Sequence, residues 1–407
     1  MAKGIGDEYD MLDADSCDFF ARARRDEPVF YSPKYDGWVI CSYEALIQAT
    51  KSPDKFSSAS NVHVNLADLA PEVQYELEQG CPGMRTLFAS DPPVHTRTRA
   101  LVNQAFSPKR IATLEPIIRD SAHEFVDAFA DKGQTDLIND FTYPLALLTI
   151  CDLVGVPREE IDRFDGAAAN YFMLVTPGIP VEEQIVRARA FASLQTYCEG
   201  MIEDRRRNPR DDYTTDLIQA RVDGENALSH EQIVGELIAA ALAGHEPTCY
   251  GVSQMMLHVL TTPGLVQRLR DEPELAGHVI EESIRLGIMN VVPRKTTTDV
   301  DIAGVTIPKD SWVFLAYRSG NWDEAKYPRP LELDLDRPEP KSHLGFGHGI
   351  HYCVGAPLAR MQARLTLEVL LERLPNLRMQ AGFKPTYEMT MQIGKLTHLP
   401  VEWDVQK

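Results

Sequence analysis

The sequence has little basic charge and no long apolar run. It holds 41 Lys and Arg against 60 Asp and Glu, a formal net charge of −19. Nucleic-acid binding needs clustered positive charge, so this balance argues against a nucleic acid as the main partner. No apolar run approaches the roughly 20 residues that span a bilayer, and the N-terminal MAKGIGDEYD lacks a signal-peptide pattern. We expect a cytoplasmic protein with no membrane segment.

Cysteine is sparse and shows no pairing pattern. The seven cysteines form no C-x-x-C pair and are odd in number, which fits a reduced compartment better than a disulfide framework. Hydrophobic residues at 44% and charged residues at 25% describe an ordinary globular protein. The length of 407 residues alone suggests about two or three domains.

The chain is organised around residues 343–364, HLGFGHGIHYCVGAPLARMQAR. Cys353 lies there between a glycine-rich loop and an expected amphipathic helix, whose first turn suits Pro357. One face of this helix is apolar and holds Leu358, Met361, Leu365 and Val369. The helix dipole favours a thiolate at this position, and the loop glycines permit a tight path beneath a flat ligand. Iron bound by this sulfur would receive electron density that favours O–O cleavage.

Two other interpretations of this stretch stay open. A lone cysteine is usually a small buried hydrophobe. Alternatively, four side chains could form a zinc cluster: His343, His348, His351 and Cys353. Their spacing does not match the commoner paired zinc patterns, and zinc would leave the glycines unexplained.

The same stretch resembles the haem-binding signature of the cytochrome P-450 family. The matching positions are Phe346, Gly347, Gly349, His351, Cys353 and Gly355. The resemblance implies that Cys353 is the axial ligand of a haem b iron and that Phe346 packs on the thiolate side of the haem. It also implies that Gly347 and Gly355 shape the haem-binding loop.

Basic side chains upstream suit the carboxylates of such a cofactor. His95 and Arg99 are four residues apart and would share one face of a helix. Two donors on one face suit a pair of carboxylates. Without the resemblance, a solvated basic face would be the default. The resemblance implies four contacts to the haem propionates: His95, Arg99, Arg294 and His351.

A long helix is expected from Ser229 to about Thr261, before Pro263. Ser229 and Gln232 form a capping-box pattern at its start. The resemblance implies that this helix passes over the distal face of the haem, with Ala243 and Gly244 against the cofactor.

The middle of this helix departs from the family pattern, which is Ala/Gly-Gly-x-acid-Thr. Glu246 matches the acid, but Pro247 stands in place of the alcohol and predicts a kink. Thr248 is one residue, about 100°, further round the helix and is no simple replacement. We expect the catalytic group to be His245, Glu246, Pro247 and Thr248, with ordered water or a substrate hydroxyl helping to deliver protons.

A distant element supports the resemblance. Glu282 and Arg285 form an i,i+3 pair that would ordinarily be a solvated surface feature. They match the family's Glu-x-x-Arg element, and Arg337 resembles the third member of that network. The resemblance implies a structural role for all three, around the thiolate loop.

The resemblance also places a substrate pocket. Its expected lining is Met84, Leu87, Phe88, Ala239, Leu242, Ala243, Asn290, Val291, Val292, Gln392 and Ile393, with Ile288 and Met289 beside them. Asn290 is either a hydrogen-bond anchor for substrate or a satisfied turn asparagine. A further apolar stripe is either distal roof or plain core: Tyr171, Phe172, Leu174 and Val175.

Shorter patterns predict the remaining elements. Strand-like runs at 28–31 and 38–41 flank an Asp-Gly turn, and a helix follows around 43–50. Residues 61–90 look irregular, with Pro71 among the breakers, and 107–225 look mainly helical.

Together these features predict one mostly α-helical domain over residues 1–407 with a smaller β-rich region, as the family has, and no fused reductase or ferredoxin domain. The function implied is a haem-thiolate monooxygenase that inserts one oxygen atom from O2 into a small or medium apolar substrate. Candidates include an aromatic, terpenoid, steroid or cyclic-dipeptide scaffold from secondary metabolism.

Electrons would come from NAD(P)H through a separate reductase and a ferredoxin or flavodoxin. Four basic side chains could contact that partner: Lys109, Arg110, Arg360 and Arg364. Because of Pro247, peroxide-driven oxidation or oxidative C–C or C–N coupling stays open as an alternative. A further alternative is a haem-binding sensor without catalysis.

Overall fold

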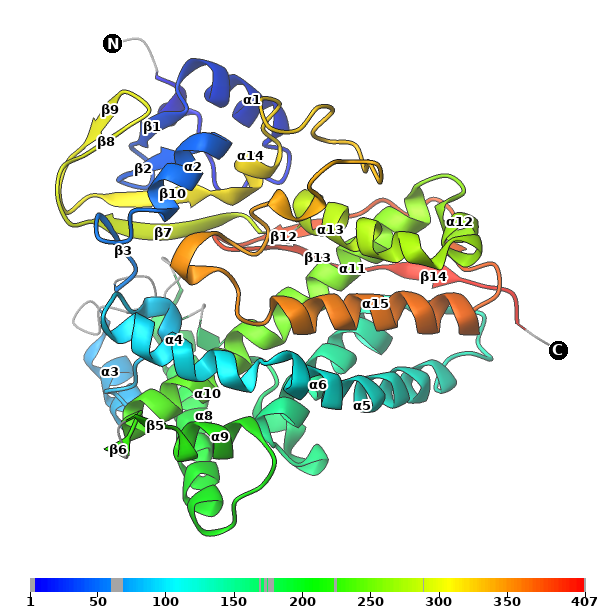
Figure 1. The fold of residues 1–407 in the computed structure, drawn as a ribbon, viewed down its shortest axis with the longest axis horizontal. Coiled ribbons are helices and arrows are strands. Elements are labelled where there is room, and N and C mark those ends of the chain that lie inside the picture. Colours follow the sequence, from blue (N-terminus) through cyan, green and yellow to red (C-terminus); the bar gives the residue numbers. More distant parts are fainter. Residues whose placement is uncertain are drawn as a thin grey trace. The chain divides into compact units, whose positions relative to one another are not determined.

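The computed structural model describes residues 4–59, 69–167, 170–171, 174, 179–222, 225–287 and 289–405. The chain divides into two compact units, and Figure 1 labels their helices and strands. Unit 1 comprises Met1–Asn61, Pro116–Tyr143 and Cys249–Lys407, and unit 2 comprises Val62–Glu115 and Pro144–Thr248. Phe172, Val175 and Ile288 lie outside the described residues, whereas Tyr171 and Leu174 are buried.

Helical residues outnumber strand residues in both units, and the predicted mainly α-helical fold with a smaller β-rich region is confirmed. Unit 2 contains α3 (Pro71–Glu78), α4 (Val94–Ala105), α8 (Val181–Arg207), α9 (Tyr213–Gln219) and α10 (His230–Gly244). Unit 1 contains α1 (Cys17–Asp26), α2 (Tyr43–Thr50), α12 (Leu265–Asp271), α13 (Ala276–Leu286), α14 (Tyr317–Asn321) and α15 (Ala356–Arg373). Among the described residues, three helices contribute to both units: α5 (Pro108–Asp127), α6 (Tyr143–Val154) and α11 (Glu246–Thr261).

The main sheet belongs to unit 1 and has the strand order β1-β2-β10-β7-β3. Its strands are β1 (Val29–Ser32), β2 (Gly37–Ile40), β3 (Phe56–Ser57), β7 (Val291–Thr296) and β10 (Trp312–Ala316). The β10–β2 pair is parallel and the other three pairs are antiparallel. A second sheet joins β11 (Arg378–Met379), β14 (Pro400–Glu402) and β4 (Gln134–Asp136).

Within the described residues, three two-stranded ribbons complete the β-structure. They are β5 (Arg221–Val222) with β6 (Glu225–Asn226), β8 (Val300–Ile302) with β9 (Val305–Ile307), and β12 (Tyr387–Met389) with β13 (Gly394–Leu396). The first of these lies in unit 2 and the other two in unit 1.

The main sheet carries a buried apolar cluster on each face. Neighbouring residues of a strand point to opposite sides and therefore belong to different clusters. On one face, Val313 and Leu315 join a cluster with Leu46 of α2. On the other face, Phe314 joins a cluster with Phe20 of α1. The β-rich region is therefore a sheet with an apolar cluster on each side, one including α2 and the other α1.

Short-range predictions for the first part of the chain are confirmed. The hairpin pairs Phe30 with Val39, and α2 follows it. Of the stretch 61–90, the structure describes residues 69–90, and these are less irregular than expected, because Pro71 begins α3 instead of breaking a pattern. Proline has no backbone N–H, and the first turn of a helix needs none, so this position suits it.

The long helix expected over residues 229–261 is two helices, α10 and α11, separated at His245. His245 has φ −97° and ψ −81°, outside the helical range. Pro247 is the second residue of α11, where its missing N–H costs no bond within the new helix. The sequence predicted a kink, and the structure has a full interruption.

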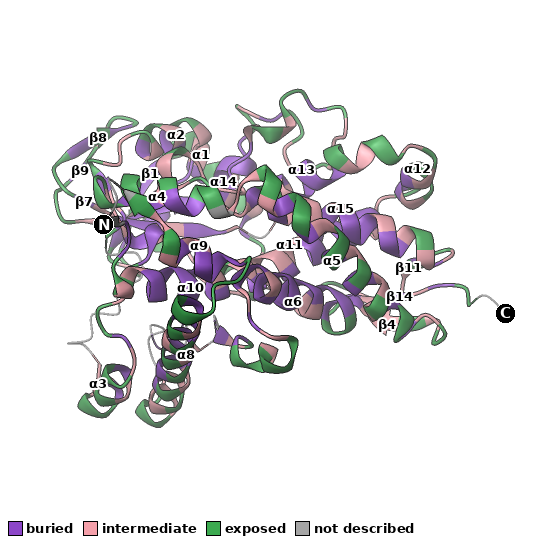
Figure 2. Cartoon of the chain, turned by 60° about the horizontal axis from the view of Figure 1, so that its bottom comes forward, coloured by how far each residue is buried: buried purple, intermediate pink, exposed green. Residues whose placement is uncertain are grey.

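None of the helices in the described ranges is long and apolar enough to cross a membrane. Figure 2 shows that α10 is buried along its middle, whereas exposed residues run along α8.

The capping box at the start of α10 is present. The Gln232 N–H donates to Ser229 Oγ at 3.3 Å, and the Ser229 N–H donates to Gln232 Oε1 at 2.9 Å. We expect Ser229→Ala to lower the free energy of unfolding by about 1 kcal/mol, because the Gln232 N–H loses its acceptor. Urea denaturation measures the change. Ser229→Asp, which keeps an acceptor, should stay within a few tenths of a kcal/mol; equal losses in both variants would contradict the assignment.

Candidate functional site

The cysteine loop of unit 1 holds Cys353 at the start of α15. Its backbone N–H donates to the Phe346 carbonyl at 2.9 Å, and Gly355 is the N-cap of the helix. Gly347 and Gly349 have φ of +70° and +73°, which favours glycine. A Cβ on Gly349 would lie 2.4 Å from the Thr50 carbonyl oxygen. The loop therefore holds a half-buried thiol in a fixed place at a helix N-terminus.

The three histidines of this loop point to three different partners. His343 Nε2 lies 3.0 Å from Glu281 Oε2, His348 Nδ1 lies 2.9 Å from Thr50 Oγ1, and His351 Nε2 lies 2.9 Å from Ser58 Oγ. Within the described ranges no group of three or more His, Cys, Asp or Glu side chains could hold a metal ion. The zinc-cluster interpretation is therefore wrong for this part of the chain.

Glu281 of α13 ties down the cysteine loop and the helix that follows it. Arg360 of α15 donates to both of its carboxylate oxygens, at 2.6 Å and 2.8 Å. The Arg360 guanidinium also lies 4.6 Å from the centroid of the Phe346 ring. Burial opposes the ionised form, but hydrogen bonds from Arg360 and His343 outweigh it and lower the pKa of Glu281 to about 2. Glu281 is therefore a buried anion at neutral pH.

The neighbouring Glu282 forms the predicted triad. Arg285 donates to its two oxygens at 2.7 Å and 2.9 Å, and Arg337 Nε donates to it at 3.0 Å. All three side chains are at most 4% exposed. Arg285 also donates to the carbonyls of Asn321 and Glu332, both at 2.9 Å. The structure thus brings the three predicted residues together as one buried network that binds the surrounding backbone.

Two predicted propionate contacts of unit 1 meet in one small pocket. Arg294 and His351 both line it, together with Ala49, Thr50, Pro53, Phe56, Leu315, His348 and Ile350. Arg294 is buried, and its guanidinium donates to the Pro293 carbonyl at 2.7 Å. A cation beside an imidazole suits a carboxylate, and a thiolate suits iron. The donor chemistry of unit 1 therefore fits a haem.

The other two predicted propionate contacts belong to α4 of unit 2. His95 is buried and Arg99 half-buried, one turn apart as expected. Burial, followed by the positive charge of Arg99, lowers the pKa of His95. Arg99 Nε donates to Asn103 Oδ1 at 2.9 Å. At neutral pH His95 is thus an uncharged imidazole that can still donate one hydrogen bond.

The residues at the helix break in unit 2 differ in their exposure to solvent. Ala243 is exposed, whereas His245 and Glu246 are 2% and 5% exposed. A Cβ on Gly244 would lie 2.4 Å from Ile150 Cδ1, so this glycine permits close packing against α6. Pro247 and Thr248 are half-buried. The predicted catalytic group therefore combines a buried acid with an exposed alanine.

The predicted pocket residues of unit 1 lie close together, and the polar one, Asn290, forms its hydrogen bonds within the chain. Asn290 is 2% exposed, and its amide donates to the carbonyls of Met11 at 2.8 Å and Thr390 at 3.1 Å. Its backbone N–H donates to the Gln392 carbonyl at 2.8 Å. Both amide hydrogens of Asn290 are thus used structurally, which favours the second of its two interpretations.

The predicted lining residues next to Asn290 differ in how deeply they are buried. Val291 is fully buried in the cluster around Phe314, and Val292 is half-buried on the opposite face of β7. Met289 bridges Ile393. Val291 is therefore a core residue, while Val292, Gln392 and Ile393 stay predicted lining.

The predicted pocket residues of unit 2 lie on α10 or on the segment that packs against it. Met84 and Phe88 are half-buried, and Leu87 begins a short 3-10 helix, η3 (Leu87–Ala89). The Leu87 N–H donates to Glu236 Oε1 of α10 at 2.7 Å. Ala239 and Leu242 are buried further along the same helix.

Three of the four predicted partner-docking residues already have carboxylate partners. Arg110 pairs with Asp211 at 2.6 Å and Asp216 at 2.7 Å. Arg364 pairs with Glu368 at 2.8 Å, and Arg360 pairs with Glu281 as described above. Lys109 is exposed. The positive charge expected at these positions is therefore largely neutralised within the chain.

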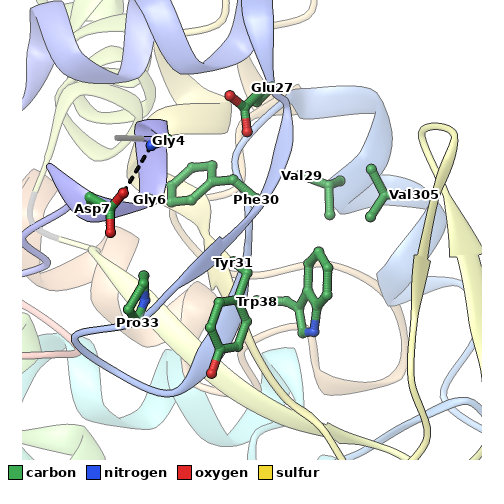
Figure 3. Close-up of a pocket in the computed structure, with 10 residues that line it drawn as sticks. All are labelled: Gly4, Gly6, Asp7, Glu27, Val29, Phe30, Tyr31, Pro33, Trp38 and Val305. Atoms are coloured by element: carbon green, nitrogen blue, oxygen red, sulfur yellow. Dashed lines mark hydrogen bonds between the residues drawn. The ribbon is translucent and has the colours of Figure 1, made fainter. Parts of the chain in front are cut away.

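A separate open pocket of about 330 Å³ lies in unit 1 beside the hairpin of β1 and β2 (Figure 3). Its lining includes Phe30, Tyr31, Trp38 and Val305. None of its described lining residues is a predicted site residue. We therefore assign this pocket no role in the predicted chemistry.

Sequence reasoning missed the polar residues whose partners are far away in the chain. Glu281 precedes the Glu-x-x-Arg element directly, and only its contacts with His343 and Arg360 reveal its role. Glu236 lay within an apolar helical run, where a lone acid was a visible exception. That exception was the signal that could have identified it.

Comparison with known proteins gives a consistent result. A family model described as cytochrome P450 matches residues 55–398. The mycinamicin IV hydroxylase/epoxidase of Micromonospora griseorubida is 34% identical over 394 residues, which cover 95% of this chain and 94% of that protein. The methyl-branched lipid omega-hydroxylase of Mycobacterium tuberculosis is 32% identical over 401 residues, covering 94% and 90%. The solved structure of cytochrome P450 CREJ in complex with (4-ethylphenyl) dihydrogen phosphate has a TM-score of 0.91 at 27% identity, covering 98% of this chain and 100% of that one.

The low pKa of Glu281 makes its contribution to stability depend on pH. Its pKa falls from 4.5 to about 2 on folding, so its stabilisation is complete above pH 4.5 and is lost as the pH falls toward 2. At about 1.4 kcal/mol per pKa unit, Glu281→Gln should cost about 3 kcal/mol at pH 7 and about half of that at pH 3. Urea unfolding at both pH values measures the difference.

Glu368→Gln is the matched control, because this carboxylate also accepts from two arginines but is 38% exposed. We expect it to cost less than about 1 kcal/mol at either pH. A cost for Glu281→Gln that does not change with pH would contradict the assigned ionisation.

Proposed function

Because this chain belongs to the cytochrome P450 family of haem-thiolate monooxygenases, which use O2, we propose that it hydroxylates or epoxidises a small or medium-sized apolar organic substrate. The observation that carries the proposal is the half-buried Cys353 thiol at the N-terminus of α15, held by a glycine loop. In the proposal, this thiolate would hold the iron of haem b. When bound, the thiolate-ligated haem supplies oxygen activation, because electron density from the sulfur favours O–O cleavage.

The proposed cofactor contacts follow from the donors on the two units. Arg294 and His351 share one small pocket in unit 1, and His95 and Arg99 share one face of α4 in unit 2. We assign all four to the propionates, with arginines supplying charge and histidines supplying directed hydrogen bonds. We assign further cofactor contacts to Phe346 and Gly347 of the cysteine loop and to Ala243 and Gly244 at the helix break.

Proton supply is where this chain departs from the family pattern. Pro247 has no backbone N–H, so the Ala243 carbonyl four residues earlier receives no helical hydrogen bond from it. We propose that a water bound to this carbonyl takes the place of the missing alcohol. Glu246, buried beside the break, then passes protons to that water, and Thr248 orders the turn.

The substrate proposal rests on an apolar lining and on the relatives. Met84, Leu87, Phe88, Leu242 and Ile393 present mainly hydrocarbon surface, which suits an apolar body with few polar groups. The relatives named above are hydroxylases, one of them also an epoxidase, and this favours oxygen insertion over coupling or ligand sensing.

The electron donor in this proposal is a separate ferredoxin or flavodoxin, reduced by NAD(P)H through its own reductase. The cytoplasm would contain both the carrier protein and its reductase. The odd number of cysteines without a C-x-x-C pair fits that reduced compartment. We place the encounter near the cysteine loop, with Lys109 as the remaining exposed positive charge of the four predicted contacts.

The carbon monoxide spectrum of the reduced protein tests the proposal. We expect the red-shifted Soret band from which the family takes its name, and we expect Cys353→Ala to abolish it. Cys17→Ala is the matched control, because Cys17 is also half-buried and should leave the band unchanged. A band typical of histidine ligation that survives in Cys353→Ala would overturn the proposal.

Replacing Pro247 tests the proposed proton supply. Pro247→Thr should raise the share of consumed NAD(P)H that ends in oxygenated product several-fold, because it restores the family's alcohol. Pro247→Ala restores the N–H without the hydroxyl and should lower that share, since the Ala243 carbonyl would then be engaged. Product and hydrogen peroxide are measured against NAD(P)H consumed. Higher yield with peroxide alone than with the redox system would instead favour the peroxide-driven alternative.

A further inference from the structure

Glu236 is a buried carboxyl in the middle of α10 that the proposed chemistry does not use. It is 3% exposed, and the residues around it in the helix are apolar and buried, among them Ile233 and Leu237. Its Oε1 accepts the Leu87 N–H at 2.7 Å. Burial, opposed by this hydrogen bond, raises the pKa of Glu236 to about 8. The side chain is therefore mainly a neutral carboxylic acid at pH 7.

The segment that Glu236 holds lies directly on α10. A Cβ on Gly235 would lie 2.0 Å from the Arg85 carbonyl oxygen, so only glycine allows this approach. The Arg85 N–H in turn donates to the Glu231 carbonyl at 3.3 Å. Residues 85–87 are thus fixed to three positions of the helix: Glu231, Gly235 and Glu236.

A second buried polar side chain fixes the beginning of the same segment. Gln195 of α8 accepts the Cys81 N–H at 3.2 Å and donates to the Cys81 carbonyl at 3.3 Å. Its amide also lies 3.1 Å from Met84 Sδ. A Cβ on Gly80 would lie 2.1 Å from Gln195 Oε1. Two helices of unit 2 therefore hold residues 80–87 at both ends.

The residues that this arrangement places are predicted to line the substrate pocket: Met84, Leu87 and Phe88. We propose that Glu236 and Gln195 are positioning residues that determine substrate range by fixing Met84–Phe88 against α10. The inference rests on the proposed function, since it assigns these residues to the same pocket. An apolar side chain at position 236 would cost less to bury but would leave the Leu87 N–H without an acceptor.

Ligand selectivity separates positioning from simple structural support. Two ligand series, n-alkyl carboxylic acids and 4-alkylphenols of increasing chain length, are titrated by the haem spin-state shift. Glu236→Gln keeps the acceptor oxygen, so its dissociation constants should stay within about twofold of the wild type at pH 7. Glu236→Ala should change the ratio between the best and the worst ligand by about tenfold or more. An unchanged ranking with a lower melting temperature would overturn the proposal.

Trypsin gives a readout that does not depend on haem. Arg85 is exposed within the held segment, so release of the segment should speed cleavage after it. We expect faster cleavage in Glu236→Ala and in Gln195→Ala, and wild-type rates in Glu236→Gln. Glu231→Gln is the matched control, because it removes an exposed carboxylate from the same helix and keeps the backbone contact to Arg85. Equal cleavage rates in all variants would contradict the holding role.

The pH profile adds a signature specific to Glu236. Ionisation above about pH 8 would place a charge in an apolar site and loosen the segment, so ligand affinity should fall there in the wild type but not in Glu236→Gln. Other groups from the packed elements are Tyr213 of α9, Arg85, and Glu199 of α8, which lies 3.5 Å from His230. Their effects would appear in both proteins, so a parallel fall in Glu236→Gln would overturn the assignment to Glu236.

The outcomes also separate this inference from the proposed function. If the wild-type protein lacks the red-shifted carbon monoxide band, the proposed function fails whatever the variants do. If the band is present in every variant while selectivity and cleavage do not change, only the positioning inference fails. Should Glu236→Ala not fold, Gln195→Ala tests the other end of the same segment with both readouts.

Discussion

Two adjacent carboxylates of α13 are the constraint on which the cysteine loop depends. Glu282 binds Arg285 and Arg337, and through them the backbone between α14 and the loop. Glu281 binds Arg360 and His343, one on each side of Cys353. Both anions are buried and both accept hydrogen bonds from arginine guanidinium groups, so loss of either carboxylate would leave arginine charge without its counter-ion. A single turn of one helix thereby fixes the position of the thiol within unit 1.

The sequence predicted those features of the two units that depend on residues close together in the chain. The glycine spacing around Cys353, the His95–Arg99 pair, the i,i+3 pair of Glu282 and Arg285 and the capping box of α10 are all local patterns. Long-range partners were not predictable in this way. Asn290 bonds Met11 and Thr390, residues 279 and 100 positions away, and no local pattern distinguishes that role from a contact to substrate.

Pro247 shows how one residue type acts at two levels. Its missing N–H predicted a disturbed helix from covalent chemistry alone. In the structure α10 ends at Gly244 and α11 begins at Glu246, and Gly244 packs closely against Ile150 at this break. The extent of the break is therefore a tertiary property, whereas its existence is a local one. The buried Glu236 lies seven residues before Ala243 on the same helix. The helix that ends at the break is therefore also the helix that binds residues 85–87.

The internal pairing of the arginines has a consequence for the kinetics of electron transfer. Arg110, Arg360 and Arg364 each direct their charge to a carboxylate of the same chain, and the chain as a whole is strongly acidic. Long-range attraction of an acidic carrier would then be weak. Encounter rates should accordingly vary little with ionic strength, or rise with added salt as mutual repulsion is screened. Short-range shape and apolar contact, more than charge, would select the carrier.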